Sequence, residues 1–120
     1  MTGGSYTTLG ITSGVSTVTS SYHPINTEGN AATDELTDIT AGTDGQIVIL
    51  TPFNSGRDVT FKHDSATTSG RSILLSGGAD RTFDTRNDTL MLVYNSIATS
   101  TTHGSATGGW CEVAFTNNAE

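Results

Sequence analysis

The sequence predicts an all-β fold, a compact sandwich or barrel-like module of six to eight short strands with an extended N-terminal arm. Three apolar segments of strand length, residues 44–50, 87–94 and 109–115, stand in a background of Gly, Ser and Thr. Turn residues such as Gly, Asn and Asp separate these and the weaker strand candidates. No segment shows a convincing helical period. Short strands divided by frequent turns are typical of sandwiches and small barrels.

The composition favours an ordered chain. Hydrophobic residues make up 33% and charged residues 14% of the 120 residues, and Ser and Thr together roughly 30%. Disordered chains are usually rich in charge and poor in β-branched residues, whereas this one is poor in charge and dense in Thr, Val and Ile. Its length fits a single folded unit.

The first 27 residues differ from the rest because they contain no Asp, Glu, Lys or Arg. We therefore divide the chain into an uncharged N-terminal arm, residues 1–27, and a β domain, residues 28–120. Such an arm buries too little by itself to offset its ordering entropy, so it is either a flexible tail or held extended by a partner. Residues 15–19 have strand propensity and could add a strand to a neighbouring subunit.

The first half of the β domain holds three candidates. Residues 34–39 fit a short strand or a single helical turn. Residues 46–51 form an almost continuous apolar run, which predicts a strand covered on both faces, and Pro52 ends it. Residues 58–63 alternate, which predicts one buried and one solvated face.

The second half continues the pattern. Residues 71–76 carry an apolar triplet, and a short piece follows around Phe83. Residues 90–94 are again nearly all apolar. Residues 96–109 form a long polar loop, and residues 110–115 form the last strand.

Charge and hydropathy exclude two kinds of partner. The formal net charge is −7, with only five Lys and Arg, so no basic stripe exists to contact a phosphate backbone. No run approaches the 18 apolar residues of a membrane span, and the N-terminus lacks the features of a signal peptide. We expect neither nucleic acid nor membrane as a partner.

The metal-binding and redox residue types do not cluster. The three histidines, His23, His63 and His103, stand far apart and none has a second ligand at i+2 or i+4. The single cysteine, Cys111, excludes an intrachain disulfide; it is either an inert buried thiol or a reactive or interchain one. We expect no metal and no cofactor.

Catalytic patterns are also missing, and we expect no enzymatic activity. No serine sits in a nucleophile elbow, and the Gly-Gly pairs lack the strand-to-helix setting of a phosphate loop. Asp84, Asn87 and Asp88 fit a turn better than a calcium site. Trp110 could stack on a sugar, but a single Trp in a small β domain is more often a core residue.

The strand segments resemble a β module of tailed-bacteriophage virion proteins, found in tail fibres and in small capsid-decorating proteins. The residues that carry the resemblance are 44–50, 58–62, 77–84, 88–94 and 109–113, within a span from Thr40 to Phe115. The resemblance implies a phage structural protein, commonly a homotrimer, without enzymatic activity.

The small size of the chain favours a decoration (cement) protein over a fibre. The expected partners are the major capsid protein and further copies of the chain, and the expected location is the capsid surface of the virion, with the host cytoplasm during assembly. The alternative is a tail-fibre tip that recognises host glycan through loop 96–109. A third class, a depolymerase with a site between subunits, would need paired carboxylates that the sequence does not place.

Two sets of residues are expected to carry the decoration function. The arm residues that would contact the capsid are Tyr6, Leu9, Ile11, Val15, Val18 and Tyr22. The residues expected in the core or at the trimer interface are Ile47, Ile49, Leu90, Leu92, Val93 and Trp110. The sequence alone does not separate core from interface, because both require apolar side chains.

Overall fold

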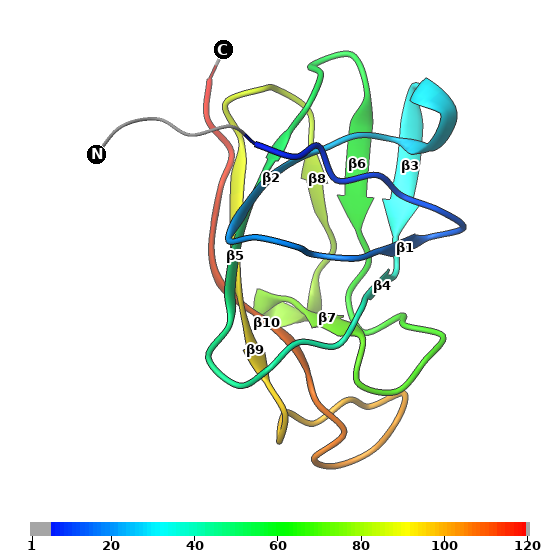
Figure 1. Cartoon of the computed structure of the whole chain (residues 1–120), viewed down its shortest axis with the longest axis vertical. Helices are drawn as coiled ribbons and strands as arrows, with labels where there is room; N and C mark the ends of the chain where they lie inside the picture. Colours follow the sequence, from blue (N-terminus) through cyan, green and yellow to red (C-terminus); the bar gives the residue numbers. More distant parts are fainter. Residues whose placement is uncertain (1–5, 120) are drawn as a thin grey trace.

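A computed structural model describes residues 6–119, which fold into three β-sheets (Figure 1). The five-stranded sheet consists, in spatial order, of β2 (Tyr22–Ile25), β5 (Ile47–Pro52), β9 (Thr89–Asn95), β10 (Gly109–Thr116) and β7 (Ser72–Leu74). The three-stranded sheet consists of β3 (Thr33–Leu36), β6 (Asp58–Phe61) and β8 (Arg81–Phe83). The smallest sheet pairs β1 (Val15–Ser16) with β4 (Asp38–Ile39). Two single 3₁₀ turns, η1 (Glu28–Asn30) and η2 (Ser76–Gly78), complete the described elements.

The five-stranded sheet is mixed. Its centre is antiparallel, since β9 pairs with β5 on one side and with β10 on the other. Its two edges, β2 and β7, are added in parallel. A bulge in β10, between Glu112 and Ala114, shifts the register against β9.

The two larger sheets enclose one core. Alternate residues of β5 and β9 point inward, and Trp110 of β10 is fully buried among them with its indole N–H donating to the Thr40 carbonyl at 3.2 Å. Phe83 of β8 lies edge-on to Phe61 of β6 at 4.8 Å and stacks on Phe115 of β10 at 6.2 Å. Aromatic rings from both sheets therefore meet in the interior.

An ion pair also joins the sheets. The Arg81 guanidinium of β8 donates to both carboxylate oxygens of Glu112 on β10, at 2.9 and 3.1 Å, and its carbon lies 5.2 Å from the centre of the Phe115 ring. Both side chains are largely shielded from solvent, so removing either partner alone would leave a poorly hydrated charge.

The all-β prediction is confirmed, but the structure does not show an extended N-terminal arm over residues 6–27. Leu9 and Ile11 are buried in the core, 5% and 3% exposed, and β1 and β2 belong to the sheets. The Leu9 amide donates to the Pro24 carbonyl, and the Leu9 carbonyl accepts from the Asn26 amide. Residues 1–5 of the predicted arm lie outside the described residues.

A buried histidine holds this segment in its fold. The Nε2 atom of His23 accepts hydrogen bonds from the Thr19 and Ser20 amides, at 3.0 and 3.1 Å, so the ring proton lies on Nδ1 and is donated to the Thr7 carbonyl at 2.7 Å. One side chain thus ties two passes of the chain together, which Figure 1 shows crossing the front of the molecule.

Ten strands appear among residues 6–119, more than the six to eight expected, partly because the N-terminal segment supplies β1 and β2. Residues 34–39 form strand, in β3 and β4, and not a helical turn. None of the helical segments in the described part of the chain is long and apolar enough to cross a membrane.

Candidate assembly surface

The outward side of the five-stranded sheet is apolar. In β9, Leu90, Leu92 and Tyr94 point into the core, so Met91 and Val93 between them point outward. In β5, Val48 and Leu50 are buried, so Ile47 and Ile49 beside them point outward. We call the outward set the apolar face, and its residues are Ile47, Ile49, Leu74, Met91, Val93, Cys111, Val113 and Ala114.

Strand register arranges this face in two rows. One row runs across four strands through Ile47, Val93, Cys111 and Leu74. The second runs through Ile49, Met91 and Ala114 and continues to Tyr22 on the edge strand β2.

Several side chains of the apolar face remain open to solvent. Ile47 is 40%, Ile49 36% and Val113 54% exposed. None of the outward-facing residues in the described strands of this sheet is Asp, Glu, Lys or Arg. Sheets that face water usually carry polar side chains on that side, and a contiguous apolar patch typically marks an interaction site.

The structure separates the six residues expected in the core or interface. Leu90, Leu92 and Trp110 are fully buried in the core. Ile47 and Ile49 lie on the apolar face, and Val93 lies there half-buried. Residues 46–51 were expected to form a strand covered on both faces. In the structure the core of the chain covers one face of this strand, and the other face stays open to solvent.

Cys111 lies in the middle of the apolar face and is half-buried. Burial raises the pKa of its thiol, which keeps it protonated near neutral pH. This environment fits the inert thiol among the alternatives from the sequence.

The expected capsid-contact residues do not form one surface. Leu9 and Ile11 are buried, and Val15 and Val18 are half-buried. Tyr6 and Tyr22 are exposed, and their rings meet edge to face at 6.5 Å.

Buried aspartates hold the polar loops. The Asp64 carboxylate accepts hydrogen bonds from the Ser100 hydroxyl at 2.6 Å and from the Thr101 amide and hydroxyl at 2.7 Å each. Burial alone would raise the pKa of Asp64, but these hydrogen bonds outweigh it and lower the pKa to about 2. The loop after β9 is thereby fixed to the turn after β6.

Two more aspartates act in the same way. Asp38 accepts from the Thr67 and Thr68 amides, and Asp88 accepts from the Asp84, Thr85 and Asn118 amides. Burial would raise the pKa of both carboxyls, yet the hydrogen bonds leave both pKa values lowered. Asp88 thus organises a turn, as the sequence favoured over a calcium site.

The histidines make structural hydrogen bonds as well. The His63 Nδ1 atom accepts from the Leu75 amide at 2.9 Å, and His103 Nε2 lies 2.8 Å from the Ala66 carbonyl. Within residues 6–119, no group of three or more His, Cys, Asp or Glu side chains is placed to hold a metal ion.

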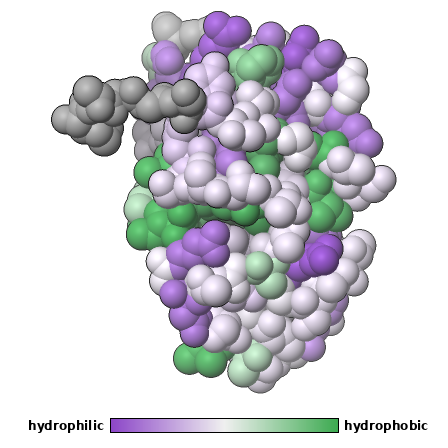
Figure 2. Space-filling model, in the orientation of Figure 1, coloured by the Kyte–Doolittle hydropathy of each residue, from purple (hydrophilic) through white to green (hydrophobic). Residues whose placement is uncertain are grey.

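Figure 2 shows the side of the molecule that the N-terminal segment crosses. Pale and hydrophilic residues cover most of it, and hydrophobic ones form a band across the middle. This view agrees with the composition, which is rich in Ser and Thr and poor in charge.

Comparison of the chain with known protein families, with curated protein sequences and with solved structures gave no match.

Proposed function

We propose that this chain is a structural protein of a tailed-phage virion, a capsid decoration protein that assembles as a homotrimer through its apolar face. The observation that carries the proposal is the uncharged outward side of the five-stranded sheet. The resemblance to phage virion modules supports the choice of class, since β5, β9 and β10, which build this side, are among the segments that carry it.

The free energy available from the apolar face supports at most association of moderate strength. Burying a Val, Ile or Met side chain completely contributes about 1.5–3 kcal/mol. The side chains of the apolar face are already partly buried, so burying each one in a contact contributes about 1 kcal/mol. A contact that covers five of the eight residues would therefore contribute about 5 kcal/mol per protomer. Association loses roughly 4–15 kcal/mol of rigid-body freedom. The oligomer should therefore depend on protein concentration unless further surface is buried.

The fold of the N-terminal segment determines which surface of the chain would bridge neighbouring capsid subunits. Because residues 6–27 pack into the module, capsid contacts would come from the folded surface of each protomer and not from an extended arm. Three copies held together multiply the modest affinity of each contact through their effective concentration. Threefold assembly on the capsid would thus stabilise the shell.

The test is the copy number of the chain in purified particles, measured against the major capsid protein by quantitative mass spectrometry. A copy number near one per capsid subunit is expected. A handful of copies per particle would place the chain in the tail, and absence from particles would contradict the virion proposal.

A further inference from the structure

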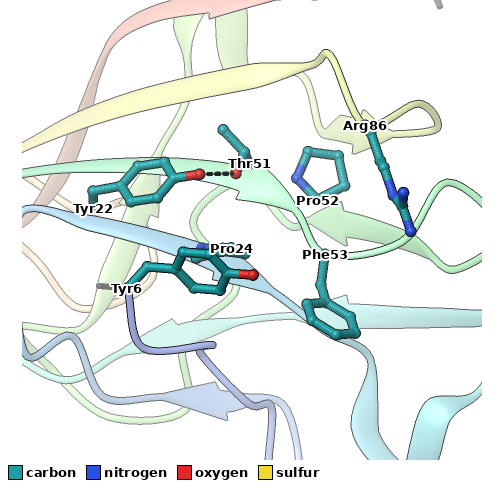
Figure 3. Close-up of a pocket in the computed structure, with 7 residues that line it drawn as sticks. All are labelled: Tyr6, Tyr22, Pro24, Thr51, Pro52, Phe53 and Arg86. Carbon is teal, nitrogen blue, oxygen red and sulfur yellow. Dashed lines mark hydrogen bonds between the residues drawn. The ribbon is translucent and has the colours of Figure 1, made fainter. Parts of the chain in front are cut away.

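A hollow of about 340 Å³ gathers three exposed aromatic rings (Figure 3). Tyr6 is 58%, Tyr22 42% and Phe53 37% exposed. We call this site the aromatic hollow, and its other residues used below are Pro24, Thr51 and Arg86. Its volume lies at the low end of small-ligand sites, enough for one or two sugar rings.

Strand pairing builds the hollow. β2 and β5 run side by side with Tyr22 opposite Ile49 and Pro24 opposite Thr51, and Phe53 directly follows the end of β5. The Tyr22 and Thr51 hydroxyls lie 3.1 Å apart, as the dashed line in Figure 3 marks. The hollow therefore offers both apolar ring surfaces and hydroxyl groups, each of which both donates and accepts.

A cation lies at one end of the hollow. Among residues 6–119, the Arg86 guanidinium has neither a hydrogen-bond nor an ion-pair partner, whereas Lys62 pairs with Glu35 and Asp80, and Arg81 pairs with Glu112. The Arg86 backbone is nevertheless held, since its amide donates to the Ser55 hydroxyl at 3.0 Å. A guanidinium whose donors have no partner within the described residues can bind a carboxylate through two parallel hydrogen bonds.

We propose that the aromatic hollow binds a saccharide that carries a carboxylate, such as a uronic acid residue of a surface polysaccharide. The aromatic rings would pack against the C–H faces of the sugar, the hydroxyls of Tyr22 and Thr51 would bond its hydroxyls, and Arg86 would bind its carboxylate. This inference goes beyond the capsid function and does not depend on it.

The backbone nearby disfavours a peptide that binds by strand addition. A peptide strand would need free main-chain groups at the outer edge of β2. Leu9 already bonds to the Pro24 carbonyl and the Asn26 amide at that edge, and Pro24 has no amide proton to donate. Recognition in the hollow must therefore use side chains, as sugar binding does, and not strand addition.

The proposal is tested by NMR titration of the ¹⁵N-labelled full chain with trigalacturonic acid and with its carboxyl-reduced counterpart. Saturable shifts at residues 6, 22, 53 and 86 are expected, with tighter binding of the acidic sugar. Phe53→Ala should weaken binding of both sugars about five- to tenfold. Arg86→Gln should weaken binding of the acidic sugar far more than binding of the neutral sugar, which removes the preference for the acid.

Ile97→Ala is the matched control, because Ile97 is also an exposed apolar residue but lies outside the hollow. It should bind both sugars like the wild type. No saturable shifts with either sugar, or binding of a proline-rich peptide in their place, would overturn the proposal. The sedimentation of each variant, measured in parallel, keeps a loss of assembly distinct from a loss of sugar binding.

Discussion

Replacing Asp64 by Asn should detach the loop after β9 at neutral pH. Asp64 has a positive φ of 47°, a conformation that Asn tolerates well, so the substitution adds no backbone strain. The substitution removes the negative charge of the carboxylate that accepts from Ser100 and Thr101. It also replaces one accepting oxygen with an NH₂ group, which cannot accept from these donors.

The pKa of Asp64 sets the magnitude. Lowering this pKa from 3.8 to about 2 corresponds to about 2.4 kcal/mol of stability at pH 7, at about 1.4 kcal/mol per pH unit. Because the folded-state pKa is the lower one, this contribution is fully present above the unfolded-state pKa and is lost as the pH falls toward 2. About half should remain at pH 3.

Urea unfolding followed by tryptophan fluorescence measures the effect at pH 7 and pH 3. Asp64→Asn should lower the free energy of unfolding by roughly 2–4 kcal/mol at pH 7 and by clearly less at pH 3. Asp58→Asn is the control, since the Asp58 carboxylate accepts no hydrogen bond within residues 6–119. An equal loss at both pH values would refute the reasoning.

Three further predictions concern the core, the ion pair between the sheets and the N-terminal segment. Leu92→Ala should lower the free energy of unfolding by about 2–5 kcal/mol, whereas Val93→Ala on the opposite face should mainly shift the dissociation constant of the oligomer, as urea unfolding and sedimentation would show. Arg81→Ala leaves the Glu112 charge buried and should cost roughly 1–3 kcal/mol, which Arg81→Ala combined with Glu112→Gln should partly restore. Deleting residues 1–22 removes β1 and buried residues, so circular dichroism should show loss of the cooperative thermal transition; a truncated chain that unfolds like the wild type would contradict the packing described here.

The strands were predictable because their signals are local. The alternation in residues 58–63 identifies a strand through its side-chain period, and the apolar runs in β5 and β9 do so through their short length and the turn residues that flank them. Trp110 was correctly favoured as a core residue over a sugar platform. Which side of β9 faces the core could not be predicted, because Leu90 to Val93 are all apolar.

The N-terminal segment shows why the rest of the fold was less predictable. An uncharged stretch with isolated apolar residues fits an arm on a neighbour as well as a segment folded onto its own core, since both bury the same side chains. The outcome depends on contacts distant in sequence, such as His23 with Thr7 and Leu9 with Pro24. The aromatic hollow was missed for the same reason, because Tyr6, Tyr22 and Phe53 meet only after β2 pairs with β5.

The mass of the purified protein in solution tests the central claim most directly. In sedimentation equilibrium across a concentration series, the mass should rise with concentration toward three times the 12.4 kDa mass of the chain. Val93→Asp places a charge in the middle of the apolar face and should give the mass of a single chain. A wild-type protein that stays at 12.4 kDa at every concentration would contradict assembly through this face.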